Sequence, residues 1–171
     1  MLTVLFGEIG IGKSTLGKKL SKKTGIKFVD GVEFLPDNLD RQLSSGIPLT
    51  KNDVDEFVIE NLIPGIQKEY RKNGTLIVAQ DLYLKRHRDL INATFGIKNV
   101  RFVWLPVHSI RTQISRLKNR TKSWLWILNA ILSKYWFEKP KYSTAFEIRN
   151  DFDVTLLCDK LLIDKENGNI I

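Results

Sequence analysis

A glycine-rich motif close to the first residue constrains this chain more than any other feature. Residues 7–14, Gly7-Glu8-Ile9-Gly10-Ile11-Gly12-Lys13-Ser14, match G-x-x-x-x-G-K-[ST] and lie between an apolar run at 2–6 and a helical pattern at 14–23. Glycines allow a tight turn whose N–H groups face inward, and a helix N-terminus adds further donors for phosphate oxygens. Four fixed identities in this context favour nucleotide phosphate binding over a turn that only reverses the chain.

The motif assigns roles to its polar residues. Lys13 supplies a point charge for the β and γ phosphates of ATP, and the Ser14 hydroxyl is placed to ligate Mg²⁺, which prefers oxygen ligands. We expect the nucleotide to contact the loop and the first helical turn: Gly7, Glu8, Ile9, Gly10, Ile11, Gly12, Lys13, Ser14 and Thr15.

Apolar runs alternate with helical patterns along the rest of the chain. We expect strands at 2–6, 27–30, 75–79, 100–105 and 154–158, and helices near 14–23, 52–72, 84–94 and 109–120. This alternation predicts an α/β fold, a five-stranded parallel sheet covered by helices on both faces. Because no repeat or low-complexity linker divides it, we expect residues 1–171 to form a single domain.

Charge and apolar content limit the partners and the location. The 27 Lys and Arg against 19 Asp and Glu give a net charge of +8, which favours an anionic partner. Residues 31–70 are acidic, however, with eight acidic and three basic side chains, and this argues against nucleic acid as the acceptor. The longest apolar stretch, 124–132, is far shorter than the ~20 residues of a membrane span. With one cysteine, Cys158, we expect a cytoplasmic protein without a transmembrane segment.

Asp30 marks a second candidate site, because it ends the expected strand at 27–30. In parallel sheets, ligands gather at the carboxyl ends of the strands. A carboxylate there can hold Mg²⁺ through water or accept a proton from an attacking hydroxyl. The alternative is an Asp-Gly turn with Gly31, and the position relative to the phosphate loop favours the functional interpretation.

Five further segments follow the phosphate loop in a recognisable order: Phe28-Val29-Asp30-Gly31 with Pro36, Ser45-Gly46-Ile47-Pro48-Leu49 with Asp53, Ile77-Val78-Ala79 with Arg88-Asp89, Arg116-Leu117-Lys118-Asn119-Arg120, and Phe137-Glu138-Lys139-Pro140. Their order and spacing resemble those of the small gluconate kinases, a branch of the P-loop kinases related to shikimate kinase. The turn at 45–49 is the more specific part, since very many families share the phosphate loop.

The sequence departs from the gluconate kinase pattern mainly at acceptor-side positions. Val32 stands where the family has its second aspartate, Leu35 where it has a histidine, and Val54 where it has an arginine. The lysine expected after the third strand is displaced, which leaves Lys85 and Arg86 as nearby candidates. The resemblance therefore supports phosphoryl transfer more firmly than it supports gluconate.

The resemblance implies a P-loop three-layer α/β/α fold, an acceptor-binding segment at about 31–70, a helical lid at about 116–135 and a homodimer. Arg116 and Arg120 lie four residues apart, and by resemblance one would border the adenine while the other reaches the phosphates in catalysis. The alternative is a solvated basic helix face. Asp30 or Glu33 would orient the attacking hydroxyl, and Arg88 would bind an acceptor carboxylate.

The stretch 124–137 is apolar almost all round and holds three of the four tryptophans. A helix of this kind must be buried, and a core or dimer interface is the favoured interpretation. An apolar acceptor pocket or a membrane-surface contact is the alternative.

These patterns together predict an ATP- and Mg²⁺-dependent kinase that phosphorylates a hydroxyl of a small metabolite, with a sugar acid such as gluconate as the favoured acceptor. One alternative is a kinase for a nucleotide or a nucleic-acid 5′ hydroxyl. Another is a nucleotide-binding interaction protein without catalysis. His87, His108 and Cys158 are assigned no chemistry.

Overall fold

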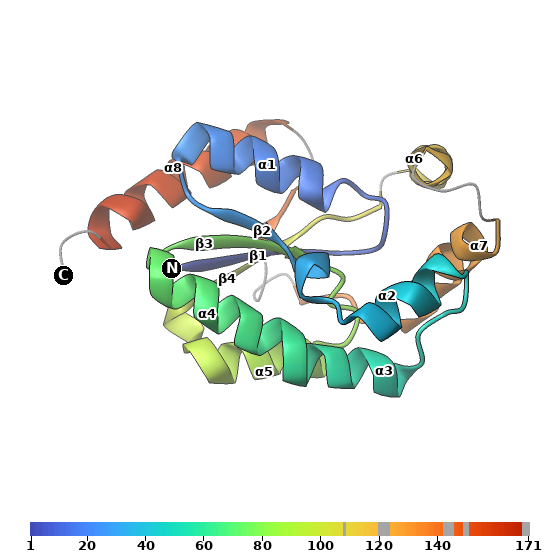
Figure 1. Ribbon diagram of the computed structural model, residues 1–171. Coiled ribbons are helices and arrows are strands. Elements are labelled where there is room, and N and C mark those ends of the chain that lie inside the picture. The colour runs from blue at the N-terminus through green and yellow to red at the C-terminus, as the bar shows by residue number, and fades with distance from the viewer. Residues whose placement is uncertain (108, 120–123, 142–145, 149–150, 169–171) are drawn as a thin grey trace.

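Five strands form one parallel sheet in the computed structural model, which describes the chain except for residues 108, 120–123, 142–145, 149–150 and 169–171 (Figure 1). The strand order is β2-β3-β1-β4-β5, so the two strands on either side of β1 come from later in the chain. The strands are β1 (Leu2–Phe6), β2 (Phe28–Asp30), β3 (Leu76–Gln80), β4 (Val100–Trp104) and β5 (Phe146–Glu147).

Helices cover both faces of this sheet. Figure 1 shows α1 and α8 on one face, α4 and α5 on the other, and α2, α3, α6 and α7 beyond one end of the strands. The α-helices are α1 (Lys13–Thr24), α2 (Asp37–Ser44), α3 (Lys51–Glu56), α4 (Ile63–Asn73), α5 (Lys85–Phe95), α6 (Ile110–Lys118), α7 (Trp124–Leu132) and α8 (Asp151–Gly168). Shorter helical turns are η1 (Gly31–Phe34), η2 (Phe57–Leu62), η3 (Ile97–Asn99) and η4 (Ser133–Trp136). The predicted P-loop α/β fold with its five-stranded parallel sheet is therefore confirmed, and no helix in the described ranges has the length and apolarity to span a membrane.

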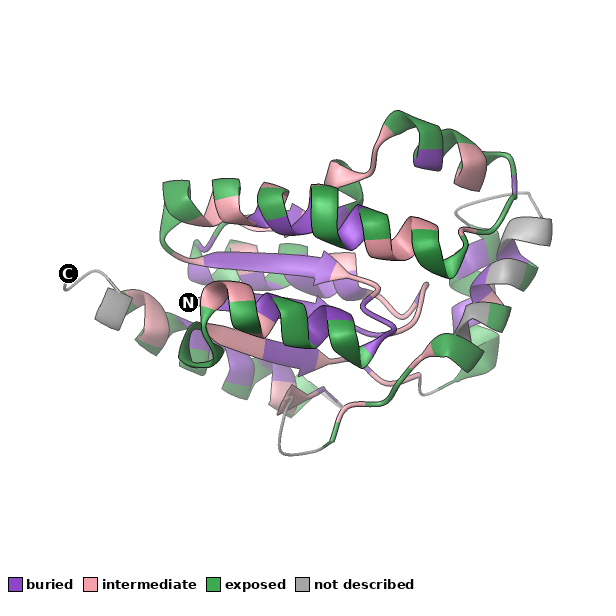
Figure 2. Cartoon of the chain, turned by 90° about the horizontal axis from the view of Figure 1, so that it is seen from below, coloured by how far each residue is buried: buried purple, intermediate pink, exposed green. Residues whose placement is uncertain are grey.

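Two apolar cores lie on opposite faces of the sheet, because successive strand residues point to opposite sides. One core is shared with α4 and α5, and the other with α1 and α8. The central strands β1 and β3 are buried along almost their whole length, as expected for a parallel sheet covered on both faces, and the outer strands include half-buried residues (Figure 2). The β1 and β3 residues of the first core are Leu2, Val4, Phe6, Leu76 and Val78, and those of the second are Leu5, Ile77 and Ala79.

The expected strand at 154–158 is wrong, since these residues lie within α8. Val154, Leu157 and Leu161 are buried at spacings of three and four, which is one face of a helix packed on the sheet. Acidic residues in the first turn, Asp151 and Asp153, favour a helix N-terminus there. The fifth strand is instead the short β5, which pairs with the end of β4.

The helix expected at 52–72 is confirmed, but it contains a π-helical segment. α3 runs into η2, a π-helix, and then into α4 without a break in the chain's helical course. Pro64 has no N–H to donate to the carbonyl of Glu60, which disfavours regular α-helical bonding just after the π segment. Phe57 and Leu62 of this segment are buried in the first core.

Gly17 tests how tightly α1 is packed on the sheet. A Cβ at this position would overlap the ring of Phe28. In an open helix, Gly to Ala would stabilise by about 1 kcal/mol. Here we expect Gly17→Ala to lower the free energy of unfolding by about 1–3 kcal/mol through overpacking, as measured by urea denaturation. Lys18→Ala, at an exposed position of the same helix, is the control and should change stability by about 0.5 kcal/mol or less. A stabilised Gly17→Ala variant would contradict the packing.

Candidate active site

The predicted phosphate loop connects β1 to α1 at the carboxyl end of the sheet. Gly7, Gly10 and Gly12 have φ values of 143°, 80° and 103°, a region that favours glycine. A Cβ at Gly7 would also overlap the carbonyl of Leu105, so the loop passes close to the end of β4. The glycine identities in the motif are thus required by backbone geometry.

Lys13 is buried at the base of this loop. Its Nζ donates to the carbonyl oxygens of Gly7 (3.1 Å) and Glu8 (2.7 Å) and forms an ion pair with the carboxylate of Asp81. Asp81 directly follows β3, which lies next to β1 in parallel register, with Phe6 opposite Gln80. Sequence reasoning missed Asp81, although a carboxylate directly after a buried apolar strand was a signal available in the sequence.

Ser14 and Thr15 lie in the first turn of α1, and Thr15 lines a cavity of about 500 Å³. This nucleotide cavity extends from the loop between α1, α6 and the start of α8. Its size suits a small ligand, and it begins where the loop N–H groups and the N-terminus of α1 favour phosphate. The hydroxyl of Ser14 and the carboxylate of Asp81 are oxygen donors of the kind Mg²⁺ prefers, so the residues present fit MgATP. Its lining includes Gly10, Ile11, Gly12, Thr15, Lys19, Arg116, Asn119 and Asp151.

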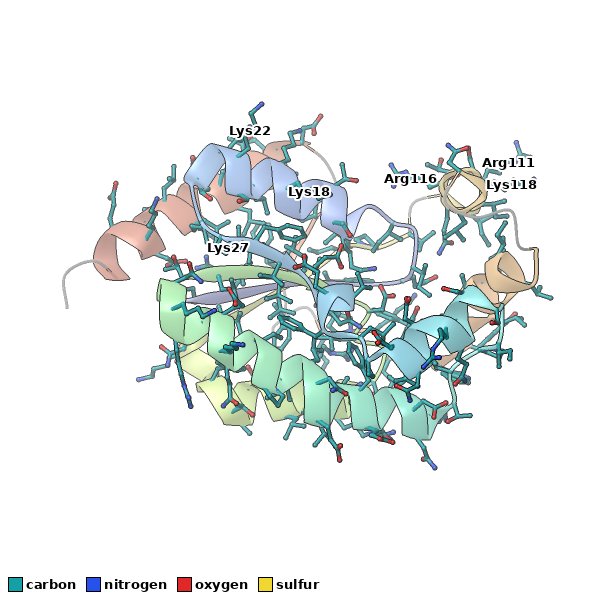
Figure 3. All side chains as sticks on the ribbon, in the orientation of Figure 1. Lys18, Lys22, Lys27, Arg111, Arg116 and Lys118 are labelled. Atoms are coloured by element: carbon teal, nitrogen blue, oxygen red, sulfur yellow. The ribbon has the colours of Figure 1, made fainter. Side chains whose placement is uncertain are left out.

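α6 rests directly on the phosphate loop. Gln113 Nε2 donates to the carbonyl of Ile9 and Arg116 Nη1 donates to the carbonyl of Ile11, both at 2.7 Å. Figure 3 shows Arg116 extending from α6 toward α1, whereas Arg111 and Lys118 extend away from the loop. Arg116 therefore lies where a nucleotide contact was expected.

Gln113 of α6 and Arg120, which follows this helix, differ in how the structure bears on their prediction. Gln113 is buried and was not singled out from the sequence, where a glutamine on a basic helix gives no signal of its own. Arg120, predicted to act in catalysis, lies outside the described residues.

Asp30 lies at the same sheet edge, opposite Ala79 of β3. Its backbone N–H donates to Glu33 Oε1 at 3.1 Å, so the two residues form a capping box at the start of η1. Gly31 packs so closely on the end of β3 that a Cβ would overlap the Gln80 side chain. Asp30 is thus held near the end of β3, while Glu33 caps the turn as an exposed residue.

A second and larger cavity, of about 730 Å³, lies on the other side of the phosphate loop. We call it the acceptor cavity. Residues from 32 to 57 form one wall, α7 and η4 form another, and the loop after β3 closes the end nearest Lys13. The described lining residues are Ile9, Val32, Leu35, Leu43, Gly46, Ile47, Pro48, Leu49, Thr50, Lys51, Val54, Phe57, Gln80, Asp81, Tyr83, Ala130, Leu132, Tyr135 and Trp136.

Arg88 has a different position from the one expected. Its guanidinium is buried and donates to the carbonyls of Leu82 and Glu138, each at 2.7 Å, with the ring of Phe6 5.1 Å away. Burial lowers the pKa of Arg88. This side chain joins the β3–α5 connection to the segment after η4 and is not among the cavity's lining residues. The geometry does not support the expectation that Arg88 binds an acceptor carboxylate.

A charged cluster joins α3 to α5. Arg86 contacts Asp55 through Nε and Nη2 at 3.1 and 2.5 Å, and His87 Nε2 lies 2.6 Å from Asp55 Oδ1. The hydrogen bond from Arg86 is the main cause that lowers the pKa of Asp55. Lys85 pairs with Asp89 along α5. Lys85 and Arg86, the candidates for the displaced family lysine, therefore engage carboxylates of the protein itself.

The aromatic stretch 124–137 divides between two environments. Ile127 and Ala130 are buried against Leu117 of α6, as expected for core residues. Trp136 lines the acceptor cavity, as the alternative interpretation required. Phe137 stacks between Phe6 and Trp104, with ring centroids 6.3 and 6.4 Å away. The same segment thus contributes to the core and to the cavity.

A phosphate loop joins the first strand to the first helix of this sheet, and an arginine-bearing helix rests on it, which is the arrangement that the motifs predicted. The chain is 31% identical over 118 residues to the thermosensitive gluconokinase of Escherichia coli (strain K12). That match covers 68% of this chain and 60% of the relative, so the chain spans less than two thirds of that curated protein. No family model matches the chain.

Solved structures share the fold. A gluconokinase from Sinorhizobium meliloti 1021 matches with a TM-score of 0.73 at 20% identity, over 96% of this chain and 93% of that one. A shikimate kinase from Acinetobacter baumannii in complex with shikimate matches with a TM-score of 0.51 at 13% identity, over 99% and 95% of the two chains. The chain is thus similar to gluconokinases in sequence and in fold, and the resemblance predicted from its motifs is confirmed.

Arg88 provides a test of its structural role. We expect Arg88→Gln to lower the free energy of unfolding by about 2–4 kcal/mol, because it leaves buried carbonyls without their donor. Arg71→Gln, at an exposed position on α4, is the control and should be nearly neutral. A variant of unchanged stability whose KM for the acceptor rises would instead show that Arg88 binds substrate.

The Asp55 cluster makes stability depend on pH. Since the pKa of Asp55 is lowered in the folded protein, its contribution is present above the unfolded carboxyl pKa of about 3.9 and is lost as pH falls through the folded value. We expect Asp55→Asn to cost about 1–2 kcal/mol at pH 7 and progressively less toward pH 3, measured by urea denaturation. A difference from the wild type that stays constant over this range would contradict the assignment. Asp159→Asn, exposed on α8, is the matched control.

Proposed function

We propose that this protein is an ATP- and Mg²⁺-dependent kinase that transfers the γ-phosphoryl group to a hydroxyl of a small molecule. The observation that carries this proposal is that the phosphate loop, with Lys13 paired to Asp81 at its base, borders two cavities. The phosphate loop contributes Ile9 to the acceptor cavity and Gly10 to the nucleotide cavity, so a phosphoryl group bound on the loop would lie close to both. This is the geometry that direct transfer between two bound molecules requires.

On the nucleotide side, phosphate oxygens would take the place of the carbonyls that Lys13 now contacts. Lys13 would then hold the β and γ phosphates, and Arg116 would border the nucleotide from α6. Ser14, together with Asp81 or Asp30, would hold Mg²⁺, which neutralises charge on the phosphates when bound. Arg120 remains a predicted second lid arginine.

On the acceptor side, Asp81 is the one carboxylate among the described lining residues of the cavity. We assign it, rather than Glu33, the role of orienting the attacking hydroxyl and accepting its proton, since the Glu33 carboxylate caps the turn at Asp30. Asp30, beside the end of β3, remains the neighbouring candidate. The names of the relatives make gluconate the reference acceptor to compare with others. A cytoplasmic location and a homodimer remain predictions.

Lys13→Met tests the proposal. We expect turnover, measured as ADP release with MgATP and acceptor, to fall by about 10³-fold or more, because the charge on the transferred group loses its stabilising cation. The methionine keeps an apolar stem in the buried position, so cooperative unfolding should persist. Lys18→Met, exposed on the same helix, is the control and should retain activity. Full activity in Lys13→Met would exclude the assignment.

A further inference from the structure

We infer that the acceptor is an alcohol with an aromatic or branched apolar body and no carboxylate, rather than a polyhydroxy acid. This inference rests on the proposed kinase function and narrows its substrate class. It comes from the chemistry of the acceptor cavity, whose walls are largely apolar and whose carboxylate and amide side chains, Asp81 and Gln80, lie at the end near the phosphate loop.

The walls are built from aliphatic and aromatic side chains that remain partly exposed to water. Val32, Ile47 and Tyr135 are 61%, 55% and 75% exposed, and Leu132 and Trp136 are exposed as well. Apolar side chains that gather in one concave region gain most from a ligand that removes them from water. A polyhydroxylated ligand would instead lose hydrogen bonds to water and find few partners on these walls, whose polar side chains among the described lining residues are Thr50, Lys51 and Tyr135.

Cationic groups for a carboxylate are scarce in this cavity. Lys51 is the one cation among the described lining residues, and its Nζ lies 5.7 Å from the ring centroid of Trp136. Arg86 is paired with Asp55, and Arg88 donates to buried carbonyls. A two-pronged guanidinium contact with an acid is therefore not offered by either arginine of α5.

Three wall positions coincide with the departures found in the sequence. Val32, Leu35 and Val54, which stand where the gluconate kinase pattern has an aspartate, a histidine and an arginine, all line the acceptor cavity. They come from η1, the turn after it and α3, so an apolar residue replaces a polar or charged one in three separate segments. Because all three replacements line the same cavity, they point to a ligand that is less polar than a sugar acid.

The polar end of the cavity fits a single hydroxyl. Gln80 and Asp81 lie there, with Lys13 paired to Asp81. In the reaction, the acceptor oxygen forms a bond to the γ phosphorus of ATP while the bond from that phosphorus to the bridging oxygen of ADP breaks, and the hydroxyl proton passes to Asp81. The products are the phosphate monoester and ADP, and no further reactant is needed.

The test compares acceptors on the full chain with MgATP. D-gluconate and shikimate represent the hydroxy acids, and 2-phenylethanol and 3-methylbutan-1-ol represent apolar alcohols. Product is measured as phosphate monoester by ³¹P NMR together with ADP release. We expect kcat/KM for at least one apolar alcohol to exceed that for D-gluconate by about tenfold or more. Faster phosphorylation of D-gluconate would overturn the inference while supporting the kinase function.

A matched pair of variants ties the preference to the cavity wall. Val54→Arg places a cation in the cavity and should lower kcat/KM for the apolar alcohol by about tenfold or more. Ile59→Arg introduces the same side chain at a position that is 55% exposed and not among the lining residues, and should leave that value unchanged. Equal effects of the two variants would overturn the inference.

Isothermal titration calorimetry tests the ligand class independently of the kinase function. Each alcohol is titrated into the protein with Mg²⁺ and a non-hydrolysable ATP analogue. Saturable binding of an alcohol that Val54→Arg weakens, without phosphorylation of any acceptor, would overturn the kinase function and support the ligand class. Absence of alcohol binding would overturn the ligand class, whatever the outcome with D-gluconate.

Discussion

A buried cation needs nearby anions or dipoles, and the site of this protein depends on how that need is met for Lys13. Two loop carbonyls and the carboxylate of Asp81 surround its Nζ. This arrangement is available only because β3 lies beside β1 in parallel register and ends at the loop. Phosphate oxygens can replace these contacts without leaving the ammonium group unpaired. The strand order, the loop and the Asp81 carboxylate therefore satisfy a single electrostatic requirement.

Backbone groups form most of the nucleotide side of the site, whereas side chains form the acceptor side. The nucleotide side consists largely of backbone, since the loop turns through glycines and α6 holds its carbonyls through Gln113 and Arg116. The acceptor side consists of side chains presented by η1, α3 and η4. Backbone geometry restricts which residues can occupy the nucleotide side. On the acceptor side, polar side chains can be replaced by apolar ones without disturbing the sheet. This explains how an intact phosphate loop and an apolar acceptor cavity occur in one chain.

Sequence patterns predicted the phosphate loop, four of the strands and three of the helices that cover them, α1, α4 and α5, because these features have local periods or fixed spacings. The prediction of a strand at 154–158 was wrong, because a short apolar run suits either a strand or a helix. The four-residue spacing of the buried Leu157 and Leu161 identifies it as a helix. Arg88 was expected to bind an acceptor carboxylate, but its guanidinium donates to the carbonyls of Leu82 and Glu138 instead. Gln113 contacts Ile9, 104 residues away in the chain, and no local pattern records this contact. Asp81 pairs with Lys13, 68 residues away, and its position directly after an apolar strand is the one local signal of its role.

The π-helical segment η2 sets the rotational phase between α3 and α4. Each residue turns an α-helix by about 100°, so deleting one residue from this segment could restore regular bonding only by turning α3 through about that angle relative to α4. α4 is anchored to the sheet through Ile63 and Ile66, and Val54 of α3 faces the acceptor cavity. The π-helical segment therefore allows α4 to pack on the sheet while α3, in the same continuous helix, is rotated so that Val54 lines the cavity. Its geometry, as much as the chemistry of its side chains, decides which residues line that cavity.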